Sequence, residues 1–200
     1  MPENETFLDK KDEELVKLTL RDKENYRYLM GRYEEKLMRY IIRLCGATRE
    51  DAEDILQNVF IKTYQNLNDF DTSLKFSSWI YRIAHNETIS FLRKSSSRPK
   101  TINSEAGSFL LNTLKADLNM EEAIDEKNTA EEINKTIKGL DGKYRDVLIL
   151  KYMEDKDYRE ISDILKKPPG TVATLLKRAR EQLKKEILKH GYLSKNVKNN

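Results

Sequence analysis

One predicted helix, residues 77–94, carries aromatic, cationic and amide side chains on a single face. Apolar residues recur at helical spacing through Ile80, Ala84 and Phe91, so this side is expected to face a core. The other side presents Trp79, Arg82, Asn86, Ser90 and Arg93. Guanidinium and amide groups bind phosphates or base edges, and an indole stacks on unpaired bases. The pattern predicts binding of nucleic acid, particularly of unpaired bases.

Two phenylalanines precede this helix in the segment NLNDFDTSLKF. Phe70 and Phe76 could form the walls of a small pocket for a base that has left the duplex. They could also be core aromatics, and for Phe76 and Trp79 the sequence supports the two interpretations equally.

A helix-turn-helix is predicted in DYREISDILKKPPGTVATLLKRAREQLKK. The two prolines of the KKPPG break cannot continue the first helix, so we expect the second helix to start at Thr171. Such a motif places its second helix in the major groove of DNA. The first helix would bury Ile161, Ile164 and Leu165.

The second helix of this motif separates into an apolar and a cationic side. Val172, Leu176, Ala179 and Leu183 are expected to face the core. The outer side presents Thr174, Lys177 and Arg178, with Ala173 and Arg180 at its flanks. Thr171 would add backbone N–H groups and a hydroxyl suited to a phosphate. The alternative is an ordinary helical hairpin with a basic, solvated face.

A third candidate surface lies in DAEDILQNVFIKTY. Its core side is expected to consist of Ala52, Ile55, Leu56, Val59 and Phe60. Asp54, Gln57, Asn58 and Ile61 follow one another along the opposite face at helical spacing. Polar groups beside an exposed aliphatic side chain are typical of a protein interface. A solvated face with one exposed isoleucine is an equally good interpretation.

The composition favours an all-α protein. The 200 residues include only seven glycines and four prolines, too few for a turn-rich β-sandwich. Helical periodicity over Asp12–Lys94 predicts three or four packed helices. We therefore expect two small helical domains, 10–95 and 126–190, joined by a flexible Ser- and Asn-rich linker at 96–125.

The net charge of +3 conceals a strong alternation along the chain. Residues 1–71 have 12 basic and 16 acidic side chains, and residues 72–100 have six and one. Residues 101–128 have two basic and six acidic side chains, and 129–200 have 17 and 11. Residues 72–100 and 129–200 are thus two separate basic segments. This arrangement is typical of a protein that binds a polyanion at two places.

Chemistry that depends on metals or disulfides is not predicted. Cys45 is the single cysteine and His85 and His190 are the two histidines, so neither a disulfide nor a zinc cluster is expected. No nucleophile–base pair indicates an enzyme, and we expect no cofactor. The start of the chain has no signal-peptide pattern, and no apolar run is long enough for a membrane span, which favours a cytoplasmic protein.

Three segments together resemble the extracytoplasmic-function (ECF) group of bacterial RNA polymerase sigma factors. They are DAEDILQNVFIKTY, FSSWIYRIAHNETISFLRK and YRDVLILKYMEDKDYREISDILKKPPGTVATLLKRAR. The likeness covers residues 10–95 as sigma region 2 and 120–188 as region 4. It implies a factor that binds core RNA polymerase and directs promoter-specific initiation, without catalysis of its own. A stand-alone helix-turn-helix regulator is the alternative.

The resemblance implies a role for each surface. The first segment would bind the clamp helices of the largest catalytic subunit through Asp51, Asp54, Gln57, Asn58 and Ile61. The second would melt the minus-ten element and capture a base of the non-template strand through Phe70, Phe76, Trp79, Arg82, Asn86, Ser90, Arg93 and Lys94. The third would read the minus-thirty-five element through Gly170, Thr171, Ala173, Thr174, Lys177, Arg178 and Arg180.

The resemblance also implies an anti-sigma factor as a candidate partner and a monomer when free. The chain departs from the family pattern in two places, in the helix-turn-helix and near the end of the second segment. Many members have basic side chains where this chain has Ala173 and Leu175, and many have Asp or Asn where it has Ser90. Because a bidentate Arg–guanine contact adds about 1 to 3 kcal/mol of discrimination, these departures are expected to alter promoter specificity.

Overall fold

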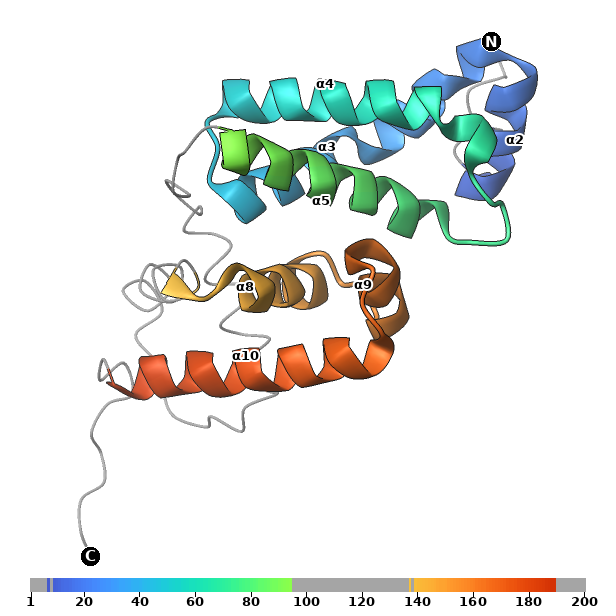
Figure 1. The fold of residues 1–200 in the computed structure, drawn as a ribbon. Helices are drawn as coiled ribbons and strands as arrows, with labels where there is room; N and C mark the ends of the chain where they lie inside the picture. Colours follow the sequence, from blue (N-terminus) through green and yellow to red (C-terminus); the bar gives the residue numbers. More distant parts are fainter. Residues whose placement is uncertain (1–6, 8, 95–136, 138, 190–200) are drawn as a thin grey trace, which may run out of the picture. The chain divides into compact units, whose positions relative to one another are not determined.

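The computed structural model describes residues 7, 9–94, 137 and 139–189, and every element within those ranges is helical. The helices form an N-terminal unit and a C-terminal unit (Figure 1). The all-α fold predicted from the composition is confirmed. The predicted linker at 96–125 lies outside the described residues.

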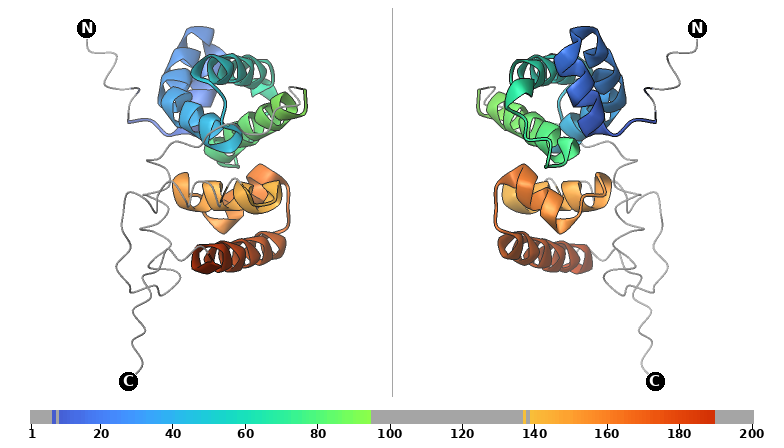
Figure 2. Two further views of the ribbon diagram at one scale, coloured as in Figure 1. Left: turned by 90° about the vertical axis from the view of Figure 1, so that its left-hand side faces the viewer. Right: turned by 90° about the vertical axis from the view of Figure 1, so that its right-hand side faces the viewer.

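The N-terminal unit contains the helices α2 (Asp12–Arg21), α3 (Tyr26–Cys45), α4 (Arg49–Gln65) and α5 (Phe76–Lys94), with short 3₁₀ turns at Lys23–Asn25 and Leu67–Asp69. Helices α3, α4 and α5 surround a common interior, as the turned views of Figure 2 show. The prediction of three or four helices is confirmed. Buried side chains include Leu29, Tyr33, Leu37, Ile41 and Leu44 of α3, the five predicted core residues of α4, and Ile80 and Ala84 of α5.

In this unit two apolar residues at helical spacing, Met30 and the predicted core residue Phe91, are not fully buried. Met30 is 36% exposed, because it lies on the side of α3 that faces a surface groove. Phe91 is half-buried, close to the end of α5. Both residues fit the helical period but lie at the border of the buried face.

The first two side chains of α2 bond this helix to α3 and to the start of α5. Asp12 forms an ion pair with Arg32 of α3 at 2.6 Å and accepts a hydrogen bond from the Tyr33 hydroxyl. Glu13 accepts the backbone N–H of Phe76, the first residue of α5, at 3.0 Å. A carboxylate at a helix N-terminus satisfies an otherwise unpaired donor and complements the helix dipole. Helix α2 therefore fixes where α5 begins.

The C-terminal unit contains α8 (Gly142–Leu148), which continues into a π-helical turn (Ile149–Met153), then α9 (Tyr158–Leu165) and α10 (Pro169–Lys189). Helix α9 starts with a capping box in which Asp157 and Glu160 each accept the other's backbone N–H, at 3.0 and 2.8 Å. Helices α9 and α10 form the predicted helix-turn-helix. The predicted core side chains Ile161, Ile164, Val172, Leu176, Ala179 and Leu183 are buried. Leu165, which was also predicted to be buried, is only half-buried at the last position of α9.

The turn between α9 and α10 is tightened by a residue in a left-handed conformation. Lys166 has φ 52°, and the N–H of Lys167 donates to the Ser162 carbonyl at 3.2 Å, as in a Schellman motif. Glycine normally occupies this position because a Cβ atom is disfavoured at positive φ.

Replacing Lys166 by glycine is therefore expected to stabilise the C-terminal unit by about 1 kcal/mol. Hydrogen exchange of α9 and α10 amides in the full chain measures this local free energy. The control is Lys167→Gly, which has no positive φ to relieve and should lower protection instead. Unchanged protection in Lys166→Gly would show that the lysine is not strained.

Candidate protein-binding and nucleic-acid-binding surfaces

The predicted stripe on α4 is exposed in the structure. Asp54, Gln57, Asn58 and Ile61 lie on its outer side, with Ile61 48% exposed, and Asp51 is half-buried near the helix start. Asn58 Nδ2 donates to the Asp54 carbonyl at 2.9 Å, which orients its amide along the stripe. The Thr48 hydroxyl caps the helix by accepting the Asp51 N–H at 3.2 Å, a favourable N-cap that α4 needs to begin here.

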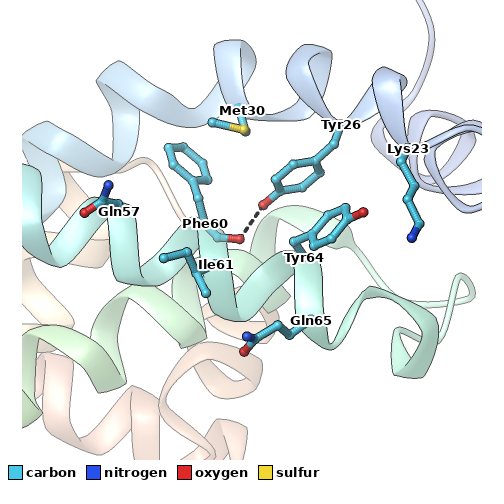
Figure 3. Close-up of a pocket in the computed structure, with 8 residues that line it drawn as sticks. All are labelled: Lys23, Tyr26, Met30, Gln57, Phe60, Ile61, Tyr64 and Gln65. Atoms are coloured by element: carbon cyan, nitrogen blue, oxygen red, sulfur yellow. Dashed lines mark hydrogen bonds between the residues drawn. The ribbon is translucent and has the colours of Figure 1, made fainter.

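An apolar groove continues this stripe toward α3. Its volume is about 560 Å³, and Figure 3 shows its lining side chains on the turn before α3, the start of α3 and the second half of α4. The Tyr26 hydroxyl donates to the Phe60 carbonyl at 2.8 Å, and the Tyr26 and Tyr64 rings lie 5.1 Å apart. Burial raises the pKa of Tyr26, so the hydroxyl stays a donor. The lining residues are Lys23, Tyr26, Met30, Gln57, Phe60, Ile61, Tyr64 and Gln65.

Gln57 and Ile61 belong to both the stripe and the groove. We call the combined surface the α3–α4 face, made of the α4 stripe and the groove lining. It joins exposed aliphatic and aromatic side chains to a polar border, the combination found at protein interfaces. Sequence analysis missed the groove, because its walls come from two helices that the sequence does not pair. The spacing gives no signal for the groove, because Met30 fits the same helical period as the buried residues of α3.

The outer side of α5 presents the predicted nucleic-acid stripe. Asn86, Ser90, Arg93 and Lys94 are exposed, and Trp79 and Arg82 are half-buried. The helix therefore brings its predicted contacts to one side, with cationic groups toward its C-terminal end.

The three aromatic side chains before and within α5 form one cluster. The Phe70 ring lies 5.4 Å from Phe76 and 5.1 Å from Trp79, and Phe76 lies 5.6 Å from Trp79. Phe76 is 0% exposed and Phe70 is 6% exposed. Phe76 thus fits the core interpretation, since a pocket wall would have to be accessible. Trp79 packs on both rings and keeps part of its surface exposed.

A preformed loop lies beside this cluster. The Asp71 carboxylate accepts the Ser73 N–H at 2.9 Å and the Asp71 carbonyl accepts the Leu74 N–H at 3.0 Å. The hydrogen bond from Ser73 lowers the pKa of Asp71, so the carboxylate that holds the turn stays charged. Leu74 projects from this turn with 50% of its surface exposed. Sequence analysis did not single out this leucine.

The side chains predicted for the outer side of α10 lie at its surface. Thr171, Ala173, Thr174, Lys177 and Arg178 are exposed, and Arg180 is half-buried at the flank. The buried Val172, Leu176 and Ala179 hold the helix against its unit, so the exposed side faces outward.

Burial raises the pKa of Asp146, in α8 of the same unit, to about 6.

The start of α10 differs from the prediction. The helix begins at Pro169, two residues before Thr171, because proline is well tolerated at the first helical position, where no N–H is needed. The Pro168 carbonyl accepts the N–H groups of Thr171 and Val172, at 2.9 and 3.1 Å. Gly170 is left with the first-turn N–H that could meet a phosphate. The expectation that Thr171 offers its own N–H was therefore wrong, although its side chain is exposed.

Two features are absent from the described part of the chain. None of its helices is long and apolar enough to cross a membrane. Its His, Cys, Asp and Glu side chains form no group of three or more that could hold a metal ion.

Comparison with known proteins defines the class first. Family models match Sigma-70 region 2 at residues 29–98 and Sigma-70 region 4 at residues 130–183. The chain is 35% identical over 172 residues to the ECF RNA polymerase sigma factor SigW of Bacillus subtilis (strain 168), covering 83% of this chain and 90% of that protein. It is 30% identical over 181 residues to the RNA polymerase sigma-H factor of Pseudomonas aeruginosa, covering 88% and 93%.

Solved structures show the same fold. The complex of CnrH with the cytosolic domain of CnrY contains a chain that matches with a TM-score of 0.65 and 20% identity, covering 90% of this chain and 97% of that one. The sigma factor RpoE from Bartonella quintana, in complex with the anti-sigma factor NepR, matches with a TM-score of 0.59 and 18% identity, covering 82% and 97%. The chain belongs to the ECF group of the sigma-70 family, and it is a sigma factor that directs transcription initiation.

Proposed function

We propose that the two units of this chain divide promoter recognition between them while the α3–α4 face binds core RNA polymerase. One observation carries the proposal: neighbouring helices of the N-terminal unit expose two unlike surfaces, a partly apolar one on α4 and a cationic one on α5. A stand-alone helix-turn-helix regulator needs neither surface. A factor that joins polymerase to DNA needs both.

The α3–α4 face has the properties of a docking site for helices of the largest catalytic subunit. Ile61 and the apolar groove would bury area, and the polar stripe would pair with polar groups of the partner. The proposed polymerase contacts are Asp51, Asp54, Gln57, Asn58 and Ile61. An anti-sigma factor is a second candidate partner of this chain, supported by one fold relative that was solved in complex with such a protein.

The outer side of α5 and the loop before it would open and hold the minus-ten element. Trp79 offers a partly exposed ring for stacking on an unpaired base, while arginines and an amide meet phosphates and base edges. Phe70 and Phe76 would support Trp79 from the core side. The proposed contacts are Trp79, Arg82, Asn86, Ser90, Arg93 and Lys94.

The outer side of α10 would enter the major groove at the minus-thirty-five element. Small side chains at Gly170 and Ala173 would allow close approach, and the long cations would reach phosphates or bases. The proposed contacts are Gly170, Thr171, Ala173, Thr174, Lys177, Arg178 and Arg180.

The remaining proposals concern the whole chain. We assign region 2 to residues 10–95, a linker to 96–125 and region 4 to 126–190. The chain would act in the cytoplasm, as a monomer when free, and would leave all covalent chemistry to the polymerase.

Transcription from a genomic fragment library tests the function. Purified chain, bacterial core polymerase and the fragments are mixed, and transcript starts are mapped. We expect co-elution with core polymerase and starts that share upstream sequence elements. Tight binding to duplex DNA by the chain alone, without co-elution or specific starts, would favour the stand-alone regulator.

Arg178→Ala is expected to weaken holoenzyme binding to all promoters found in this way. If Arg178 contacts a phosphate, the slope of log affinity against log salt should fall in magnitude by about 0.9. Fluorescence anisotropy over a potassium chloride series measures both quantities. The control is Arg39→Ala, which also removes one positive charge, from an exposed side chain of α3. It should change neither the affinity nor the salt slope. An altered base preference with an unchanged slope would instead make Arg178 a base reader.

A further inference from the structure

An ion pair connects α4 to α5 at the edge of the nucleic-acid surface. Lys62 Nζ lies 2.6 Å from Glu87 Oε1. The Glu87 side chain is 17% exposed and the Lys62 side chain is 52% exposed. Glu87 is the single acidic residue in residues 72–100, a segment with six basic ones. The pair therefore involves the one carboxylate of the basic segment.

Glu87 lies next to the proposed DNA contacts. It directly follows Asn86 and precedes Ser90 by one helical turn, and side chains three apart on a helix are neighbours. An uncompensated carboxylate at this place would repel a phosphate that approaches the exposed side of α5. Lys62 approaches it from the neighbouring helix and cancels that charge.

We infer that Lys62 is a positioning residue of the DNA-binding surface, which neutralises Glu87 so that the non-template strand can lie along α5. The inference depends on the proposed function of α5. Lys62 itself sits on α4, between the α3–α4 face and the nucleic-acid stripe, and belongs to neither set of proposed contacts.

A purely mechanical role makes different predictions. If the pair only fastened α4 to α5, removing either partner would loosen α5, and both changes would weaken DNA binding. Partly exposed ion pairs contribute little to stability, so this role is weakly supported. A role in charge compensation requires the two changes to act in opposite directions.

The test uses holoenzyme assembled from core polymerase and the full chain as wild type, Lys62→Met, Glu87→Gln, or both. The probe is a labelled single-stranded oligonucleotide with the non-template sequence of a minus-ten element found by transcript mapping. Lys62→Met should weaken binding about fivefold, the effect of one unit charge near a phosphate at an intermediate dielectric. Glu87→Gln should strengthen it, and the double variant should return close to wild type. The salt slope should fall in Lys62→Met and rise in Glu87→Gln.

Three results would overturn the inference: weaker binding in both single variants, no change in either, or a Lys62→Met defect confined to assembly with core polymerase, measured separately. Wild-type holoenzyme that fails to bind the probe would instead overturn the proposed function, so the two failures are distinguishable.

Discussion

Asp54→Arg combined with Asn58→Ala is expected to weaken binding of this chain to core RNA polymerase by about a hundredfold or more. Both side chains belong to the exposed α4 stripe, and the Asn58 amide is oriented by its bond to the Asp54 carbonyl. The arginine would place a long cation where the partner meets a carboxylate, and the alanine would leave any polar partner of the amide unsatisfied.

Titration of labelled core polymerase with each variant measures this effect. Glu35→Arg is the matched control, since it makes the same charge reversal at an exposed position of α3 that does not belong to the α3–α4 face. It also breaks the exposed pair with Arg39, which contributes only a few tenths of a kcal/mol. Equal core affinity for the double variant and the control would refute the interface. Duplex binding through α10 should be unchanged in both.

The helices and their buried faces were predictable from sequence because helical periodicity is a local property. The five predicted core residues of α4 are all buried, and the exposed stripe opposite them follows from the same period. The same argument placed Val172 and Leu176 in the core of the C-terminal unit. Spacing alone could not distinguish Met30, at the border of its face, from the fully buried Leu29.

What the sequence could not predict depends on contacts between distant segments. The groove requires α3 beside α4, and the cap of α5 requires Glu13 to reach Phe76 across 63 residues. The start of α10 was misplaced for a different reason. A Pro-Pro pair reads as a break, but the second proline can also open a helix, and only the backbone geometry distinguishes these two uses.

From the sequence, Trp79 could be either a core aromatic or a residue that stacks on a base. Its position in the structure is compatible with both roles at once. Its ring packs on Phe70 and Phe76 on one side and is partly exposed on the other. Trp79→Ala is expected to weaken promoter opening about ten- to a hundredfold, because stacking of one base on an aromatic ring contributes about 1 to 3 kcal/mol. Permanganate reactivity of unpaired thymines in the holoenzyme–promoter complex measures the opening.

The same substitution also uncovers Phe70, so a loss of stability has to be separated from a loss of stacking. Trp79→Phe retains a ring that can pack and stack, and it should keep most of the opening activity. Phe76→Leu changes the fully buried ring and should lower the free energy of unfolding with little effect on opening at a temperature where the variant is folded. If Trp79→Ala and Phe76→Leu lose stability and opening in the same proportion, Trp79 is a core residue alone. A loss of opening in Trp79→Ala that exceeds its loss of stability requires the exposed part of the ring to contact DNA.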